Sequence, residues 1–306
     1  MMYIVLYVIS GLIAAYLLLS LILFLVIFSK PKILDFTKIN LIPYPEEIKK
    51  GLNLLINMPY EEVIIPSFDK IKLVGRLYEI KNPRSLIILV HGYSSSGIQD
   101  FGSVFNLYQN FGYNILIIAQ RAHGVSGGHF CTFGIKESRD LLEWTTWATH
   151  KFPFLDIKFS GVSLGSTTIL MAQKYMPVQV SAIVADCGFI SPALIFKHQA
   201  KTFYHLPSWL FMGLLKFWAL LFLHIKISQS TLSSLNTKQV PILFVHGRAD
   251  NFVPFWMGEK MYNTYQGKKD FIFVEGARHG CSYFKDPQGV IEKITNFFNA
   301  IDHPLK

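Results

Sequence analysis

The feature that most constrains the fold is an alternation of short apolar runs with longer helical patterns through residues 62–301. Runs rich in Ile, Leu and Val predict strands buried on both faces, as in a parallel sheet covered by helices. We expect strands at 86–90, 114–119, 157–160, 181–185, 242–245 and 271–274, after a hairpin at 62–65 and 72–80. The helical patterns lie at 99–111, 136–151, 166–175, 255–265 and 290–300. The predicted fold class is therefore α/β, with a mainly parallel sheet flanked by helices.

Polar residues and glycines directly follow nearly every predicted strand. The carboxyl ends of parallel strands meet at one edge of a sheet, and ligands bind there. We therefore expect an active-site rim made by His91-Gly92-Tyr93, Arg121-Ala122-His123-Gly124, Ser163, Asp186, His246-Gly247-Arg248-Ala249-Asp250 and Gly276-Ala277-Arg278-His279.

The pentapeptide Gly161-Val162-Ser163-Leu164-Gly165 reads G-x-S-x-G and joins a predicted strand to a predicted helix. A serine at such a corner sits in a strained turn that exposes its hydroxyl. Flanking glycines leave room for the tight turn and for close packing of helix on strand. The motif alone is a weak signal, but its position makes Ser163 the candidate nucleophile.

A serine nucleophile needs a base, and the base needs a carboxylate that orients it. Histidine suits the base because its pKa lies near neutral pH. The chain supplies Ser163, Asp250 and His279 in that order, each after the end of an expected strand. Asp186 also ends a strand and is the alternative acid.

With these motifs, residues 62–301 resemble an α/β-hydrolase, close to the serine-aminopeptidase/esterase-like branch that carries a membrane anchor in some bacteria. The resemblance implies catalytic roles for Ser163, Asp250 and His279, and Val253-Pro254 favours Asp250 over Asp186. It also implies an oxyanion hole made by the backbone N–H groups of Tyr93 and Leu164, each worth on the order of 100-fold to 1000-fold in rate.

The other histidines and the cysteines do not indicate a second catalytic or binding site. His91 is interpreted as structural, in a tight turn after a strand, and His246 as a core residue at a strand end. His123, in a glycine-rich loop, is interpreted as a structural hydrogen-bonding residue, with a substrate contact as the alternative. The sequence lacks zinc-ligand spacing such as H-E-x-x-H and lacks phosphate-binding glycine loops, so we expect neither a metal nor another cofactor. The three cysteines, Cys131, Cys187 and Cys281, form no C-x-x-C and are expected to be free.

Residues 3–28 are almost entirely apolar and contain no charge. This exceeds the roughly 20 residues that cross a bilayer, so we expect a single-pass anchor. A signal peptide is the competing interpretation, but no basic segment precedes the run and no A-x-A follows it. Lys30, Lys32 and Lys38 follow the run, which favours a cytoplasmic catalytic domain.

The expected organisation is an anchor at 1–30, a connector at 31–60 and a hydrolase domain at 61–306. The connector contains a predicted amphipathic helix within 42–58, expected to pack on the domain rather than on the membrane. An insert at about 188–238 is expected to form a lid. Its apolar part, 206–225, suggests a second membrane span or a lid helix resting on the bilayer, and Lys216 favours the lid.

The sequence thus predicts a membrane-anchored serine hydrolase that cleaves carboxylic esters of lipophilic acyl groups. The net charge of +9 is spread thinly, which favours an anionic membrane surface over nucleic acid as its counterpart. The expected partners are an acyl substrate and the bilayer. Acyl transfer or cleavage of an amide on the same three residues, and non-catalytic binding on this fold, are the alternatives.

Overall fold

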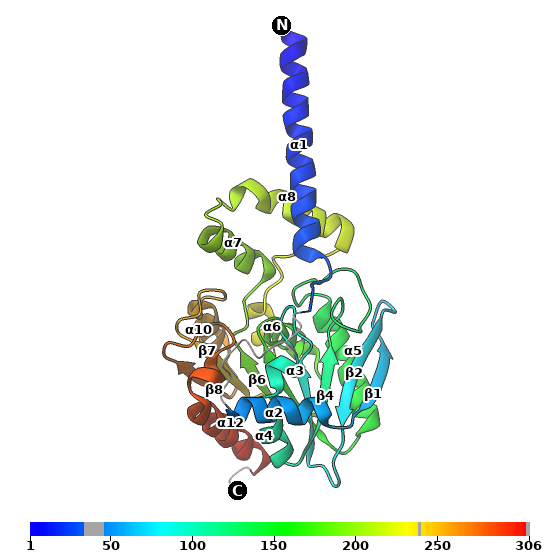
Figure 1. Cartoon of the computed structure of the whole chain (residues 1–306), viewed down its shortest axis with the longest axis vertical. Coiled ribbons are helices and arrows are strands. Elements are labelled where there is room, and N and C mark those ends of the chain that lie inside the picture. Colours follow the sequence, from blue (N-terminus) through cyan, green and yellow to red (C-terminus); the bar gives the residue numbers. More distant parts are fainter. Residues whose placement is uncertain (34–45, 238–239, 304–306) are drawn as a thin grey trace.

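The computed structural model describes residues 1–33, 46–237 and 240–303. Within these residues, eight strands form one sheet in the order β1-β2-β4-β3-β5-β6-β7-β8 (Figure 1). Strands β1 and β2 pair antiparallel, β2 pairs antiparallel with β4, and every other pairing is parallel. The predicted mainly parallel sheet is confirmed. The strands are β1 (Glu61–Pro66), β2 (Lys72–Tyr78), β3 (Ser85–Val90), β4 (Tyr113–Ala119), β5 (Asp156–Val162), β6 (Val180–Asp186), β7 (Ile242–Gly247) and β8 (Lys269–Val274).

Side chains of the central strands alternate between two apolar layers, because successive residues of a strand point to opposite faces. In β3, Leu86, Ile88 and Val90 join one core cluster, while Ile87 and Leu89 join the other. Helices α5 (Glu137–Lys151), α6 (Leu164–Ala172) and α10 (Phe255–Thr264) contribute to the first layer. Helices α4 (Phe105–Asn110) and α12 (Pro287–Asp302) contribute to the second.

Strand β8 differs from the prediction of a buried strand, since most of its side chains are partly exposed. It is the last strand of the sheet and pairs only with β7, so it has no neighbour on its outer side. The apolar run at 271–274 still packs on both faces, with Ile272 and Val274 on the second core layer and Phe271 and Phe273 on rings of α10, and the open edge accounts for the partial exposure.

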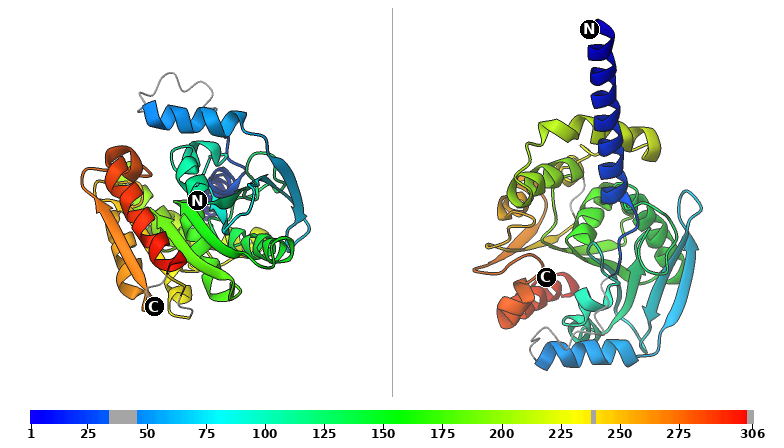
Figure 2. Two further views of the ribbon diagram at one scale, coloured as in Figure 1. Left: turned by 90° about the horizontal axis from the view of Figure 1, so that it is seen from below. Right: turned by 45° about the horizontal axis from the view of Figure 1, so that its top comes forward.

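The predicted helix at 99–111 is broken into α3 (Ile98–Phe101) and α4. Gly102 lies at the break, and glycine is a poor helix former. Helix α2 (Glu46–Asn57) crosses here with its own glycine, Gly51, against Gly102. A Cβ on Gly51 would lie 2.0 Å from the carbonyl oxygen of Gly102, so this close crossing needs glycine. The part of the predicted connector helix that the structure describes thus packs on the domain, and Figure 2 shows α2 on its outside.

The insert between β6 and β7 forms α7 (Pro192–Phe203), α8 (Trp209–Leu223) and α9 (Leu232–Leu235). Ser191 caps α7 by accepting the N–H of Leu194, and Pro192 occupies its first turn. Helix α8 has 15 residues, about 23 Å, which is too short for the hydrocarbon core of a bilayer. A short 3-10 helix (Gln173–Tyr175) follows α6, and the short helix α11 (Ser282–Lys285) precedes α12.

Helix α1 (Met2–Phe28) projects beyond α8 and carries the N-terminus away from the domain (Figure 1). In the part of the chain that the structure describes, it is the one helix long and apolar enough to cross a membrane. Most of its side chains are exposed, but Phe24 and Phe28 are fully buried in the first core layer. The lower end of α1 is therefore part of the folded domain.

Candidate active site

Ser163 occupies a tight corner between β5 and α6. Its backbone has φ 52° and ψ −110°, a strained conformation for a residue with a side chain. A Cβ on Gly161 would lie 2.7 Å from the carbonyl carbon of Gly165. The glycines of the G-x-S-x-G motif therefore allow the helix to start directly against the strand, as predicted.

Gly165 is the most restricted position of the corner. A methyl group there would lie 1.8 Å from the carbonyl oxygen of Val90, which belongs to the central sheet. We expect Gly165→Ala to lower the free energy of unfolding by about 3 kcal/mol or more, because backbone must move. Gly213→Ala is the matched control, since Gly213 on α8 has open space at the same position. Thermal unfolding of both proteins in detergent checks this, and equal midpoints would contradict it.

The structure brings the three predicted residues into one hydrogen-bonded chain. His279 Nε2 lies 2.9 Å from Ser163 Oγ, and His279 Nδ1 lies 2.7 Å from Asp250 Oδ2. A carboxylate only accepts hydrogen bonds, so Nδ1 carries the proton. Nε2 is then free to accept the proton of the Ser163 hydroxyl.

Asp250 is held from several sides. Its Oδ1 accepts the backbone N–H groups of Phe252 at 2.9 Å and Val253 at 2.8 Å. His246 Nε2 lies 3.3 Å from Asp250 Oδ2 and 3.0 Å from the carbonyl oxygen of Val253. Burial opposes ionisation, but the hydrogen bonds from His246 and His279 lower the pKa of Asp250 to about 2. The carboxylate is therefore ionised throughout the neutral range.

The contact between His246 and Asp250 was missed by sequence reasoning, which interpreted His246 as a core residue. His246 is indeed buried, at the end of β7. Its spacing of four residues from Asp250 is the signal that could have revealed the contact. Because its Nε2 lies close to Asp250 Oδ2 and to the carbonyl oxygen of Val253, His246 helps to hold the carboxylate of Asp250 in place.

Asp186, the alternative acid, lies elsewhere in the site. Its backbone carbonyl accepts the N–H of Ser163 at 2.8 Å, while Asp250, not Asp186, is the carboxylate hydrogen-bonded to His279. Among the described residues, Asp186 Oδ1 is buried without a hydrogen-bond partner. Burial raises the pKa of Asp186 to about 6.

This raised pKa predicts a pH-dependent stability. The pKa rises from 3.8 to about 6 on folding, so the unfolded chain ionises first and the folded state loses stability as pH rises from about 4 to 6. We expect Asp186→Asn to stabilise the protein by about 1 kcal/mol at pH 8, allowing for solvent in the neighbouring cavity. At pH 4 the difference should vanish. Thermal unfolding at both pH values measures it, and a stabilisation that is equal at both would contradict the assignment.

The loop after β3 holds Tyr93 close to the serine. The N–H of Gly92 donates to Asp100 Oδ2 at 2.7 Å, and His91 Nδ1 donates to the carbonyl of Gly92 at 2.7 Å. Leu164 supplies the first N–H of α6, which has no partner from a preceding helical turn. Tyr93 and Leu164 line one cavity together with Ser163. This placement fits the oxyanion hole that the resemblance implies.

His91 and His123 lie behind this loop as neutral, buried side chains. Burial lowers the pKa of His91 to about 4 and that of His123 to about 3. His91 Nε2 accepts the N–H of Gln120 at 3.0 Å, and the rings of His91 and His123 pack at 4.9 Å. His123 also packs edge-on against Tyr93, at 6.0 Å. Both histidines thus contact the loop rather than the nucleophile.

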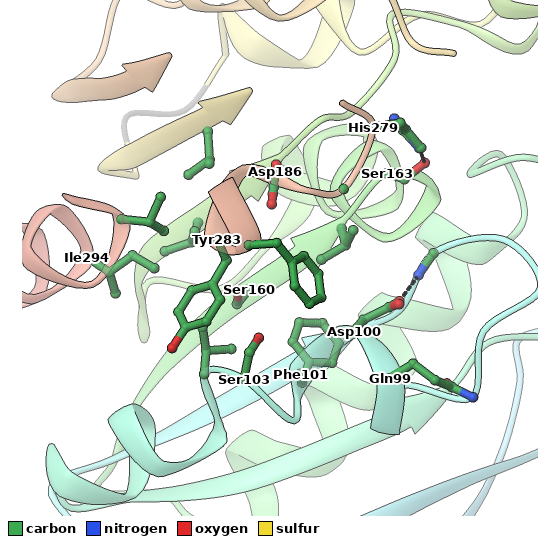
Figure 3. Close-up of a pocket in the computed structure, with 18 of the residues that line it drawn as sticks. Gln99, Asp100, Phe101, Ser103, Ser160, Ser163, Asp186, His279, Tyr283 and Ile294 are labelled. Atoms are coloured by element: carbon green, nitrogen blue, oxygen red, sulfur yellow. Dashed lines mark hydrogen bonds between the residues drawn. The ribbon is translucent and has the colours of Figure 1, made fainter. Parts of the chain in front are cut away.

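Two cavities meet at Ser163. The first, which we call the inner cavity, has a volume of about 510 Å³ and is lined by His279, Asp100 and Asp186 among others. Figure 3 shows Ser163 and His279 close together at one end of it. The second, which we call the lid cavity, has a volume of about 390 Å³. Its walls are almost entirely apolar and come from α1, α7, α8 and the loops at Tyr93, Phe133, Phe189 and Phe252.

One group of potential metal ligands lies within the described residues. The donor atoms of Cys187, Asp250 and His279 are all within 4.8 Å of one another. Burial raises the pKa of the Cys187 thiol well above its usual value, whereas metals bind the thiolate. Asp250 and His279 already bond each other, so the geometry suits a hydrogen-bonded proton relay better than a metal ion.

Two known proteins are similar to this chain in sequence. The uncharacterized protein YqkD of Bacillus subtilis is 25% identical over 242 residues, covering 78% of this chain and 79% of that protein. The uncharacterized membrane protein YNL320W of Saccharomyces cerevisiae is 27% identical over 229 residues, covering 72% and 74%.

Solved structures show the fold. The esterase Pf2001 of Pyrococcus furiosus superposes with a TM-score of 0.65 at 24% identity, covering 82% of this chain and 93% of that one. Est1E of Butyrivibrio proteoclasticus, solved with ferulic acid, gives 0.62 at 21% identity, covering 78% and 98%. The α/β-hydrolase GrgF of a Penicillium species gives 0.64 at 17% identity, covering 80% and 99%.

The expected α/β-hydrolase fold is therefore confirmed. A family model matches residues 99–301, which is more than half of the chain and includes the serine corner and the two residues hydrogen-bonded in series behind it. This chain belongs to the prolyl oligopeptidase family of α/β-hydrolases.

Proposed function

We propose that this chain is a membrane-anchored serine hydrolase that cleaves carboxylic esters with lipophilic acyl groups, in the esterase-like branch expected from the sequence. The observation that carries the proposal is the relay from Ser163 through His279 to Asp250 at a strained strand-to-helix corner. This arrangement activates a hydroxyl for attack on a carbonyl carbon.

The reaction follows from the positions of these groups. Ser163 Oγ attacks the carbonyl carbon while its proton moves to His279 Nε2, 2.9 Å away. The carbonyl oxygen becomes an oxyanion, stabilised by the N–H groups of Tyr93 and Leu164. The intermediate collapses to an acyl-enzyme when His279 returns the proton to the leaving alcohol. Water, activated by the same histidine, then releases the acid.

We propose that the two cavities hold different parts of the substrate. Leu164 lines only the lid cavity, while His279 lines only the inner cavity. The leaving oxygen must lie near the histidine that protonates it, which places the leaving group in the inner cavity. The acyl chain then occupies the lid cavity, whose apolar walls suit a lipophilic chain.

A retained membrane anchor is supported by the packing of α1. A signal peptide is removed from the mature protein. Loss of α1 would take Phe24 and Phe28, both fully buried, out of the core. We therefore propose that α1 remains as a single-pass anchor. The lysines that follow the apolar run favour a catalytic domain on the cytoplasmic side. Protease accessibility on intact cells tests the orientation, and digestion of the domain from outside would overturn it.

Cleavage of a peptide or amide is the second candidate, because the matching family is named for an oligopeptidase. The apolar lid cavity favours an acyl ester instead, and the similar solved structure of Pf2001 is that of an esterase. The same relay could also transfer the acyl group to another alcohol.

The test uses the full-length protein in its membrane fraction. We expect covalent labelling by an ethoxy fluorophosphonate and hydrolysis of p-nitrophenyl esters that increases from acetyl to octanoyl. The matched octanoyl anilide should be cleaved far more slowly. A preference for acetyl would remove the lipophilic assignment, faster anilide cleavage would favour an amidase, and absence of both labelling and hydrolysis would favour a binding protein.

A further inference from the structure

The lid cavity has a wall that comes from the N-terminal helix. Leu23, Val26 and Ile27, in the last two turns of α1, line the same cavity as Ser163. We propose that α1 is part of the acyl-binding site as well as an anchor, and that the acyl chain of a membrane lipid enters the lid cavity along it. This inference rests on the proposed hydrolase function for the identity of the ligand.

Specific contacts fix α1 against the lid. Trp218 Nε1 on α8 donates to Ser20 Oγ at 2.9 Å, and the rings of Phe24 and Phe222 lie 5.8 Å apart. Phe28 packs edge-on against Phe196 of α7, also at 5.8 Å. These contacts hold the cavity wall in a defined position, which a flexible tether could not do.

The connection below the helix is equally fixed. The backbone N–H of Lys30 donates to the carbonyl oxygen of His129 at 2.7 Å, and Lys30 Nζ donates to that of Gly124 at 3.0 Å. The N–H of Cys131 donates to the carbonyl oxygen of Phe28 at 2.8 Å. The chain therefore leaves α1 as a short bridge on the loop at 129–131, and the cavity wall cannot swing away freely.

The length of α1 places the cavity at the membrane surface. About 20 helical residues cross the hydrocarbon core. Helix α1 has 27 residues, and its domain end, where Phe24 and Phe28 are buried in the core, is the part that also carries the cavity-lining residues Leu23, Val26 and Ile27. The cavity wall of α1 thus lies where the hydrocarbon core gives way to the headgroups.

The mouth of the cavity is apolar on this side. Val26 is 70% exposed, Tyr204 is 71% exposed and Leu206 is 50% exposed, although all three line the cavity. Exposed apolar side chains continue along α8 at Phe217, Leu220 and Leu221. An acyl chain that moves from the bilayer into the cavity stays in contact with apolar surface, so it is never transferred through water.

Binding of a fatty acid tests the wall without requiring catalysis. The protein is full-length Ser163→Ala in lipid nanodiscs, the probe is 11-dansylaminoundecanoic acid, and empty nanodiscs are the blank. We expect Val26→Trp, which fills the mouth, to weaken binding by about tenfold or more. Leu19→Trp is the matched control, because Leu19 lies on the same helix, 66% exposed and outside the cavity lining.

Ester hydrolysis by the chain with Ser163 intact gives the second measurement. The ratio of kcat/KM for a dodecanoyl ester to that for an acetyl ester should fall about tenfold in Val26→Trp and stay constant in Leu19→Trp. Leu23→Ala enlarges the cavity and should move the preferred chain length upward. If Val26→Trp fails to fold, the shift in preferred chain length in Leu23→Ala tests the same proposal.

The outcomes separate the two proposals. Equal fatty-acid binding by the Val26→Trp and Leu19→Trp proteins would overturn the role of α1, even if the enzyme hydrolyses esters. Weakened binding by Val26→Trp alone, in a chain that neither labels nor hydrolyses, would support the role of α1 and reject the hydrolase function.

Discussion

Replacement of Ser163 by alanine is expected to abolish covalent labelling by a fluorophosphonate and to lower kcat/KM for an octanoyl ester by about 10⁴-fold or more. The hydroxyl is the group that would form the acyl-enzyme, and His279 Nε2 lies 2.9 Å from it. Without it, His279 can at best activate water, with no covalent intermediate. Gel labelling of membrane fractions and initial rates measure both effects.

Ser166→Ala is the matched control for this experiment. Ser166 lies in the first turn of α6, three residues after Ser163, and is also buried, and within the described part of the chain its hydroxyl has no hydrogen-bond partner. Its loss should leave labelling and rate close to those of the unsubstituted protein. Labelling that persists in Ser163→Ala, or disappears equally in Ser166→Ala, would mean that another residue reacts or that the probe reports folding alone.

The sheet and its active edge could be predicted because their signals are local. A buried strand in a parallel sheet is a continuous apolar run, and the residue after it lies at the carboxyl edge. Ser163, Asp250 and His279 each follow such a run, so their convergence needed only the class of sheet and not its strand order.

Other features depend on packing between distant segments. The contact of His246 with Asp250 requires Gly258, because a Cβ there would lie 2.3 Å from His246 Nδ1. Helix α1 is apolar on every side, so periodicity could not reveal that Phe24 and Phe28 face the core. The lid cavity joins residues of α1 to residues of α7 and α8, more than 160 positions later in the chain, and sequence pattern carries no trace of that pairing.

Asp250→Asn is expected to lower kcat/KM by about 10⁴-fold while leaving the fold intact. The carboxylate accepts a hydrogen bond from the N–H of His279 Nδ1 at 2.7 Å, which keeps Nε2 unprotonated toward Ser163. An amide can present its NH₂ group to Nδ1, and the imidazole then carries its proton on the wrong nitrogen. The amide also carries no charge to stabilise the imidazolium that forms during attack. Steady-state rates measure the loss, and circular dichroism checks the fold.

Asp186→Asn is the matched control, since Asp186 also follows a strand and lines the inner cavity. If Asp250 is the acid, Asp186→Asn should lose far less activity, and any effect should concern the leaving group that shares its cavity. A 10⁴-fold loss in Asp186→Asn with a mild effect in Asp250→Asn would reverse the assignment. The hydrogen bonds of the two carboxylates are the reason for expecting Asp250 to be the acid. Asp250 accepts hydrogen bonds from His279, from His246 and from two backbone N–H groups, and its pKa falls to about 2. Asp186 is not hydrogen-bonded to His279, its Oδ1 has no hydrogen-bond partner among the described residues, and burial raises its pKa to about 6, so its carboxylate is stabilised far less than that of Asp250.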